Sequence, residues 1–262
     1  MKKYILLLIS IFLLGFYVNA QKEGYNWYFG NGAHVDFSAA TPVGSNNSSM
    51  NAGEGCASIS DANGNPLFYT NGQSVWGANG NIIATGLKGE QSSAQSAIVV
   101  PDPGNTNRYY VFTVPNWETN DNYDMNTSKE GLRYTIIDMS LNGGAGGVVI
   151  INGNQNQEVN NSIREQVTSV SDGNGGFWIV THERGNTAAS AQSRRFLSYN
   201  LTSTGLNLTP VVSTVGSIIY SGNNRYGYLK FSQDGSMLCS TLGGNWGGTT
   251  VQSGSMKRKV SR

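Results

Sequence analysis

Short apolar segments separated by glycine-bearing turns dominate the pattern of this sequence. In residues 56–84, three Asn-Gly pairs begin at Asn63, Asn71 and Asn79, at intervals of eight residues. Asn-Gly is typical of tight hairpin turns because both residues tolerate positive φ. The segments around the turns, ASIS, PLFYT, QSVWG and NIIAT, are too short for helices and rich in residues that favour strands. The pattern predicts a four-stranded antiparallel meander, which is the unit of a β-propeller blade.

The same plan, a strand followed by an aspartate-bearing turn and an aromatic strand, recurs along the chain. Its turn residues are Asp61, Asp102, Asp172 and Asp234, whose carboxylates we expect to accept backbone N–H bonds in structural turns. The repeats predict an all-β fold, namely an incomplete β-propeller of four-stranded antiparallel blades with about four to five blades present. A β-sandwich with similar hairpins is the alternative.

The expected domain organisation has three parts. Residues 1–20 combine two lysines, an apolar run and a small-residue cleavage site, which predicts a secretory signal peptide; an uncleaved anchor is the alternative. Residues 21–246 hold the strand pattern of a partial propeller, interrupted by a polar loop at 38–53 and an insertion at 115–130. Residues 247–262 lack apolar alternation, and we interpret them as an irregular basic tail produced by truncation or a shifted reading frame.

Composition and charge narrow the partners and the compartment. Charged residues make up 13% of the chain and glycine supplies 34 of its 262 residues, as expected for an exported protein made of many hairpins. The formal net charge is only +1 and includes the basic tail, so nucleic acid is not expected as a partner. No apolar stretch after the leader is long enough to span a membrane. A secreted or outer cell-surface protein is therefore expected.

The only two cysteines, Cys56 and Cys239, lie in different predicted strands. An oxidising compartment outside the cytoplasm would permit a disulfide between them. Two buried, unbonded side chains that behave as small apolar residues are the favoured interpretation.

Six separated blocks of the sequence carry a family resemblance. They are NWYFGNGAHVDF, EGCASISDANGNPLFYTNGQSVW, QSAIVVPDPGNTNRYYVFTV, GLRYTIIDMSLNGGAG, FWIVTHE and LTSTGLNLTPVVSTVGS. Together they resemble the N-terminal propeller region of large exported proteins of gliding, Bacteroidetes-type bacteria. The resemblance implies a surface-associated protein of gliding motility and type IX secretion. The segment 190–196 and everything after Leu242 depart from the family pattern, and no sorting module is recognisable, so the resemblance implies that export route only for a full-length relative.

Histidine-based chemistry has little support in the sequence. His182-Glu183 begins like a zinc-protease motif, but Asn186 occupies the position of the second histidine, and FWIVTHE is predicted to be a strand. With His34 and His182 as the only histidines, no Ser-His-acid triad is singled out. A strand histidine paired with a nearby polar group is the favoured interpretation.

The insertion at 115–130 holds the remaining candidates. Trp117 and Tyr123 are aromatic residues outside any predicted strand, where they could bind a sugar or a partner, or anchor the loop on the domain. Asp121 and Asp124 are candidate calcium ligands, because no turn requirement explains them, whereas a hairpin turn explains the similar oxygen spacing in DANGN. No other cofactor is expected.

The expected function is recognition without catalysis. We expect an exported, cell-surface propeller that acts as a binding or display module in adhesion or gliding, with a glycan, a surface polymer or a protein as partner. The alternative is a propeller-type carbohydrate-active enzyme, for which the sequence offers many pairs of carboxylates and no preferred one. A fragment that does not fold stably is the third possibility, because a propeller without all its blades leaves strand edges unpaired.

Overall fold

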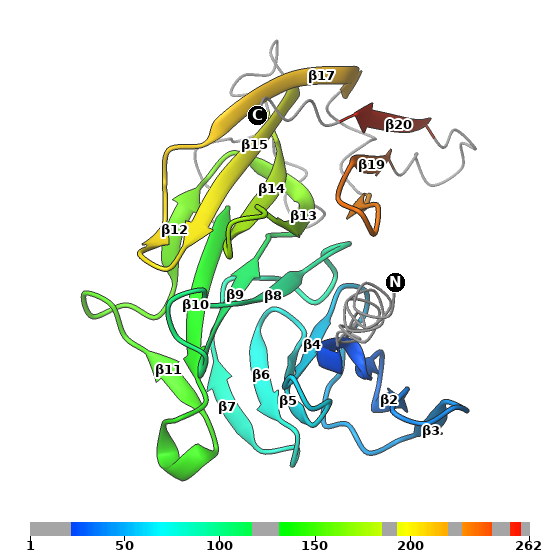
Figure 1. Cartoon of the computed structure of the whole chain (residues 1–262), viewed down its shortest axis with the longest axis vertical. Coiled ribbons are helices and arrows are strands. Elements are labelled where there is room, and N and C mark those ends of the chain that lie inside the picture. Colours follow the sequence, from blue (N-terminus) through cyan, green and yellow to red (C-terminus); the bar gives the residue numbers. More distant parts are fainter. Residues whose placement is uncertain (1–21, 117–130, 185–192, 220–226, 243–251, 258–262) are drawn as a thin grey trace, which may run out of the picture.

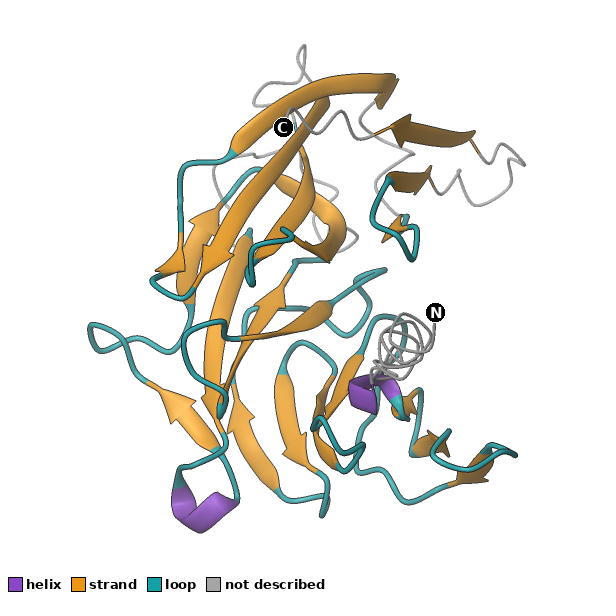
Figure 2. Cartoon of the chain, in the orientation of Figure 1, coloured by secondary structure: helices purple, strands orange, loops and turns teal. Residues whose placement is uncertain are grey.

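The structure is a computed structural model that describes residues 22–116, 131–184, 193–219, 227–242 and 252–257. The fold is all-β, as predicted, and the described residues contain two three-residue 3-10 helices and no α-helix (Figure 2). Five antiparallel sheets follow one another along the chain, each built from consecutive strands (Figure 1). Within the described part of the chain, no helix has the length and apolar character needed to cross a membrane.

The first two sheets contain the hairpins that the sequence indicates most clearly. Their strands are β1 (Asn26–Phe29), β2 (Ala33–Asp36), β3 (Val43–Ser45), β4 (Ala57–Ser60), β5 (Pro66–Thr70), β6 (Ser74–Gly77) and β7 (Ile82–Thr85). β4 to β7 pair in chain order, which confirms the four-stranded meander. β3 lies in the stretch that the sequence predicts as a loop. It pairs with β2 through backbone hydrogen bonds, which require no apolar pattern.

Glycine conformations produce the turns of the meander. Gly64, Gly72 and Gly80 have φ angles of 91°, 85° and 80°, in the left-handed region that glycine enters without a steric penalty. The preceding asparagines are not among the described residues with positive φ, so only the glycine of each pair is left-handed. Instead, the side chains of Asn71 and Asn79 accept N–H bonds from the residue two positions further along, which closes the turn from the side chain.

The third and fourth sheets each have five strands. They are β8 (Ala97–Pro101), β9 (Arg108–Thr113), β10 (Leu132–Asp138), β11 (Gly147–Val149) and β12 (Gln157–Asn160), followed by β13 (Ile163–Ser171), β14 (Phe177–Glu183), β15 (Ser193–Thr202), β16 (Gly205–Leu206) and β17 (Val211–Ile219). β10 pairs with both β11 and β12, and β15 pairs with both β16 and β17. β10 and β15 are the longest strands of their respective sheets, and each pairs with two shorter strands along one side.

The fifth sheet corrects one expectation about the end of the chain. Its strands are β18 (Leu229–Phe231), β19 (Met237–Leu242) and β20 (Gln252–Lys257). β20 pairs with β19 over six residues inside the stretch that the sequence predicts as an irregular tail. The expectation is wrong for these residues because main-chain hydrogen bonds to a neighbouring strand are sufficient to form an edge strand.

Hydrophobic clusters lie between consecutive sheets. Tyr28 of the first sheet and Tyr69 of the second stack with their ring centroids 4.2 Å apart. Each of the other three clusters likewise joins two sheets. Phe68 and Val111 are buried between the second and third sheets, Phe112 and Leu197 between the third and fourth, and Phe196 and Leu229 between the fourth and fifth. Each inner sheet therefore buries apolar residues on both faces.

The first strands of successive sheets contact one another in chain order. β1 contacts β4, β4 contacts β8, β8 contacts β13 and β13 contacts β18. Figure 1 shows the sheets along an arc that begins with β2 and β3 at the lower right, passes β11 at the lower left and reaches β20 at the upper right. The described residues do not close this arc into a ring.

Candidate functional site

The four predicted turn aspartates all lie in turns between paired strands. Asp61 and Asp172 each accept N–H bonds from the residues two and four positions further along, at 2.7–2.9 Å. Asp234 accepts the hydroxyl of Ser232 and the N–H and hydroxyl of Ser236, and these bonds lower its pKa to about 2. The carboxylates close the turns, in the way that the sequence predicts.

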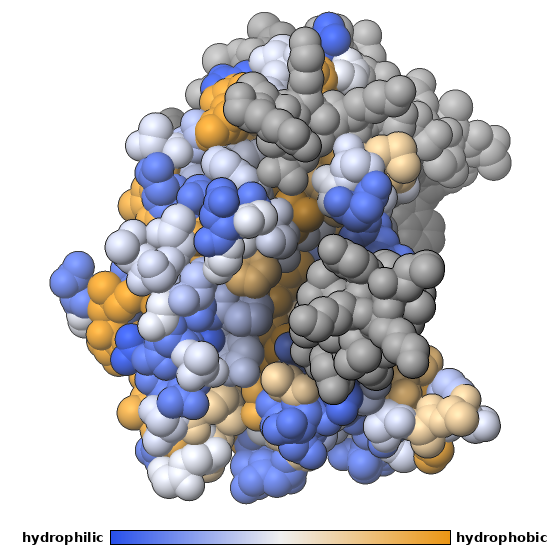
Figure 3. All heavy atoms as spheres, viewed as in Figure 1, coloured by the Kyte–Doolittle hydropathy of each residue, from blue (hydrophilic) through white to orange (hydrophobic). Residues whose placement is uncertain are grey.

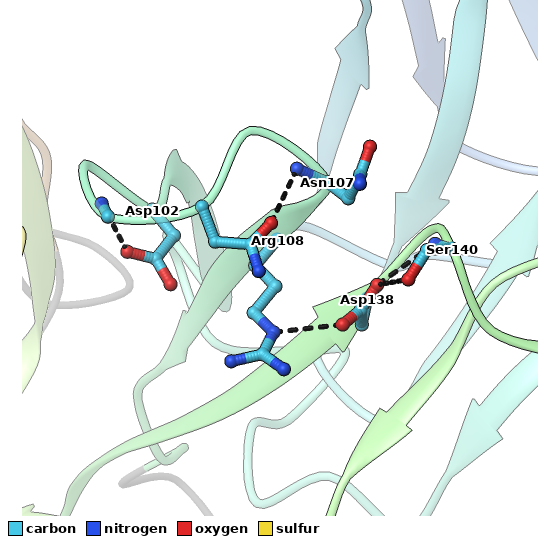
Figure 4. A network of polar contacts seen from close by, with 7 residues as sticks. Asp102, Asn107, Arg108, Asp138 and Ser140 are labelled. Carbon is cyan, nitrogen blue, oxygen red and sulfur yellow. Dashed lines mark hydrogen bonds and ion pairs between the residues drawn. The ribbon is translucent and has the colours of Figure 1, made fainter.

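The turn of Asp102 lies near an ion pair of the third sheet (Figure 4). Asp102 accepts the N–H of Gly104 at 2.8 Å. Arg108 Nε donates to Asp138 Oδ2 at 2.8 Å, which joins the start of β9 to the end of β10. Hydrogen bonds from Ser140 and then from Arg108 hold the pKa of Asp138 below its ordinary value. This network stabilises strand ends, and its carboxylates are occupied by bonds within the chain.

The binding and calcium candidates of the insertion, Trp117, Asp121, Tyr123 and Asp124, lie outside the described residues. The two strands that the insertion connects, β9 and β10, are paired neighbours. Among the residues that the structure does describe, no three His, Cys, Asp or Glu side chains are grouped so as to hold a metal ion.

Cys56 and Cys239 are not bonded to each other, which agrees with the favoured interpretation. Cys56 is half-buried, and burial raises the pKa of its thiol. Cys239 is exposed, so the expectation of a buried side chain is wrong for this residue. The cause is its place on β19, where it alternates with the buried residues Leu238 and Ser240.

A polar pocket of about 670 Å³ lies beside the third sheet, and we call it the amide pocket. Lys88, in the link between the second and third sheets, and Arg133 of β10 contribute to its lining. The other lining residues come from the connection between β11 and β12 and the start of β12: Ile151, Asn152, Asn154, Asn156, Gln157 and Glu158.

Hydrogen bonds hold the connection between β11 and β12 in place. Ile151 and Asn154 form an isolated antiparallel bridge with N···O distances of 3.0 Å. Gln157 Nε2 donates to the carbonyl of Asn154 at 2.7 Å. The amides of Gln155 and Asn156 donate to main-chain carbonyls at the end of β7 and just after it, at 2.8 and 2.9 Å. These bonds fix the pocket wall to two sheets, so the pocket is largely formed before any ligand arrives.

The charges in the amide pocket are unevenly exposed. The Arg133 side chain is 8% exposed, and its Nη2 lies 3.2 Å from Oε2 of Glu158, whose side chain is 61% exposed. Lys88 adds a second cation at the exposed edge. The neighbouring Asn and Gln side chains each carry both a hydrogen-bond donor and an acceptor. Such a lining is suited to a ligand rich in hydroxyl groups.

Sequence reasoning did not identify the amide pocket. The available signal is the stretch INGNQNQEVNN at 151–161, in which seven of eleven residues are Asn or Gln. Such a stretch indicates only a polar loop, and Lys88 and Arg133 are distant from it along the chain. Only the folded chain brings the three segments together.

No family model, curated protein or solved structure matches this chain. The likeness to exported propeller proteins therefore rests on the quoted sequence blocks alone. The chemistry of the amide pocket is accordingly inferred from its own residues.

A cluster of polar residues, separate from the amide pocket, is buried where the fourth sheet meets its neighbours. β13 has three residues, Arg164, Glu165 and Gln166, between its pairs with β14, whereas β14 has only His182 there. The extra residues form a bulge, a feature found at sheet edges and near active sites. We call these four residues the bulge cluster, and each is at most 4% exposed.

The bulge cluster forms hydrogen bonds to segments outside the fourth sheet. Glu165 Oε2 accepts the N–H of Ala94 at 2.9 Å, and Gln166 Nε2 donates to the carbonyl of Thr241 at 2.9 Å. The cluster thus joins the fourth sheet to the segment before β8 and to β19. His182 Nδ1 lies 2.8 Å from the carbonyl of Glu183, which agrees with the favoured interpretation of a strand histidine paired with a polar group.

Proposed function

We propose that this chain is an exported, cell-surface binding or display module whose five sheets are the blades of an incomplete β-propeller. The contacts of β1, β4, β8, β13 and β18 in chain order support the propeller, because blades pack through their inner strands around a common axis. In the alternative sandwich, two sheets would pack face to face. The predicted leader at residues 1–20, outside the described part, supports export.

The amide pocket is the observation that carries the binding role. Its volume of about 670 Å³ falls within the range of roughly 300–1,000 Å³ that is usual for ligand sites. Its lining of amides with two cations and one carboxylate favours a hydroxyl-rich ligand, so the proposed partner is a glycan or another polar surface polymer. Figure 3 shows hydrophilic residues over much of the face in view, with apolar residues between them in small areas. A surface of this kind is compatible with recognition of a polar polymer.

Retention on immobilised polysaccharides, neutral and uronate-bearing, tests the proposal. Lys88→Gln removes a cation at the exposed edge of the pocket, and we expect retention to weaken about tenfold, as for loss of a hydrogen bond to a charged group. Lys230→Gln is the matched control, because Lys230 is exposed on β18 and does not line the pocket.

Three outcomes would count against this assignment. Equal weakening by Lys88→Gln and Lys230→Gln would mean that general charge, rather than the pocket, causes retention. Release of reducing ends from the polysaccharides would favour the carbohydrate-active enzyme over the binding module. Retention by neither the wild-type protein nor its variants would remove the polysaccharides tested from the set of partners.

A further inference from the structure

The chain contains seven Asn-Gly pairs, and all of them lie within the described residues. Their asparagines are Asn31, Asn63, Asn71, Asn79, Asn142, Asn152 and Asn174. In such a pair the main-chain nitrogen of glycine can attack the side-chain carbonyl carbon of asparagine, because glycine has no Cβ to hinder the approach. The attack requires an asparagine side chain that is able to rotate and a glycine N–H that is not held by another acceptor.

Four of the seven glycine nitrogens are held. The N–H groups of Gly32, Gly64 and Gly80 donate to main-chain carbonyls at 2.8–2.9 Å. The N–H of Gly72 donates to a buried threonine hydroxyl at 3.0 Å. Ring closure at these pairs requires that the hydrogen bond break first, so the fold protects them.

The other three pairs differ in how their asparagine side chains are held. Their glycine N–H groups have no partner among the described residues. The amide of Asn142 donates to the carbonyl of Gly146 at 2.8 Å, which fixes that side chain. Asn152 and Asn174 are exposed, and their side chains form no hydrogen bond with the described part of the chain. A Cβ on the glycine after either one would meet nothing within 4 Å, so both turns are open.

We propose that Asn152 and Asn174 are sites of spontaneous intramolecular deamidation in the folded protein. The following glycine nitrogen attacks the asparagine Cγ, a C–N bond forms to close a succinimide, and the Cγ–Nδ2 bond breaks. Ammonia leaves and carries the proton that the glycine nitrogen loses. Water then opens the succinimide at either carbonyl, which gives aspartate or isoaspartate. The sequence of steps needs water alone and no oxidant, reductant or cofactor.

Conversion of Asn152 changes the amide pocket, because this residue is part of its lining. A neutral amide becomes a carboxylate near Glu158, and the isoaspartate product also adds a methylene group to the main chain. The pocket then presents one more negative charge to a ligand. Asn174 lies in the turn between β13 and β14, outside the pocket lining, and so serves as an internal reference.

Timed incubation of the full chain at mildly alkaline pH tests the proposal. Tandem mass spectrometry localises each converted asparagine, and enzymatic methyl transfer detects isoaspartate. We expect Asn152 and Asn174 to convert at least about tenfold faster than Asn63 and Asn71, because a rate factor of that size follows from a hydrogen bond that must first break.

Two controls separate the effect of the fold from that of the dipeptide. In denaturant, all seven pairs should convert at similar rates, because each then has the same local sequence. Asn152→Gln should abolish conversion at residue 152 and leave the rate at Asn174 unchanged, since glutamine must close a larger ring. Equal rates at all seven pairs in the folded protein would overturn the proposal, as would conversion at Asn71 that is faster than at Asn152.

Discussion

At the scale of single residues, burial decides what His182 can do. The sequence places it beside Glu183 and admits a comparison with zinc and triad histidines. In the fold its ring is fully buried and packs edge-on against Phe196, with the ring centroids 4.4 Å apart. Burial, and then the charge of Arg164, lower its pKa to about 3. The side chain is therefore neutral at physiological pH and contributes to packing and to one main-chain contact.

The buried His182 predicts a specific dependence of stability on pH. Unfolding exposes the ring, which binds a proton below its ordinary pKa of 6.5, whereas the native ring stays neutral down to about pH 3. The unfolded state thus binds more protons in this window, so stability falls as pH decreases, by up to about 1.4 kcal/mol per unit. We expect His182→Phe to flatten the decline between pH 6.5 and about 5, above the range in which aspartates titrate.

Urea denaturation of both proteins at several pH values measures this difference. The free energy of unfolding of the wild-type protein should decline through the window, and that of His182→Phe should change less. Parallel curves for the two proteins would contradict a neutral buried histidine. A general loss of stability in the variant shifts its curve without changing the slope, so the test does not depend on an undisturbed core.

Residue patterns predicted the roles of polar groups in turns better than those in strands. Asp61 and Asp172 lie in local sequences whose bonds span only a few residues, so the turn chemistry was readable. Glu165 and Gln166 belong to a strand and would ordinarily face solvent. Their partners are Ala94 and Thr241, more than seventy residues away, and no local signal specifies such contacts.

At the scale of elements, the meander β4 to β7 was predictable because turn chemistry and strand composition agree within one short stretch. β3 and β20 were not, because each is defined by its pairing with a neighbouring strand rather than by its own pattern. The Asn-Gly pairs of the meander indicated the positions of the turns but did not specify the conformation of their asparagines, which lie outside the left-handed region. The side chains of Asn71 and Asn79 accept backbone N–H bonds, which closes these two turns without a left-handed asparagine.

We predict that an alanine substitution destabilises the protein more at Gly72, in the turn between β5 and β6, than at Gly153. A Cβ on Gly72 would lie 2.1 Å from Oγ of Ser96, a fully buried side chain that donates to Asn71 O at 2.6 Å. Gly153 has a similar φ of 76°, but a Cβ there would meet nothing within 4 Å. We expect Gly72→Ala to cost roughly 2–4 kcal/mol through backbone strain and the clash together, and Gly153→Ala roughly 1–2 kcal/mol through strain alone.

Chemical denaturation of the two alanine variants provides the comparison. Because both glycines have left-handed backbones, the difference between the variants isolates the effect of the clash with Ser96. Equal destabilisation would mean that the second sheet and the segment before β8 can separate at little cost. That result would contradict the close approach of the two segments at Gly72.

At the scale of the whole molecule, contiguous stretches of chain form each sheet, and this is why the sequence predicts sheets well. The assembly of sheets depends on contacts between distant segments, which the pattern does not specify. The amide pocket is one example, since its lining joins Lys88 and Arg133 to the β11–β12 connection. Gln95 is another: it is a polar residue in the serine-rich link before β8, yet it bonds to both the fourth and the fifth sheet.

We predict that hydrogen bonds of Gln95 attach the fifth sheet to the rest of the molecule. Its Oε1 accepts the N–H of Leu229 at 2.8 Å and that of Val167 at 3.2 Å, and its Nε2 donates to the carbonyl of Leu229 at 3.2 Å. Gln95→Ala removes all three bonds and leaves buried main-chain groups without them. We expect amide hydrogen exchange in β18 and β19 to accelerate about 30-fold, which corresponds to roughly 2 kcal/mol of lost local stability. Exchange in β4 to β7 should stay unchanged.

Gln155→Ala is the matched control, because it makes the same substitution but removes a bond to Thr85 in the second sheet. It should leave exchange in β18 and β19 at the wild-type rate. Uniform acceleration in all five sheets on Gln95→Ala would mean that the sheets unfold as one cooperative unit. Unchanged exchange in the fifth sheet would mean that its hydrophobic cluster and the bond from Gln166 to Thr241 secure it without Gln95. Either result would contradict a specific attachment through Gln95, whereas selective loss would establish the fifth sheet as a separate unit of local stability whose attachment to its neighbours depends on Gln95.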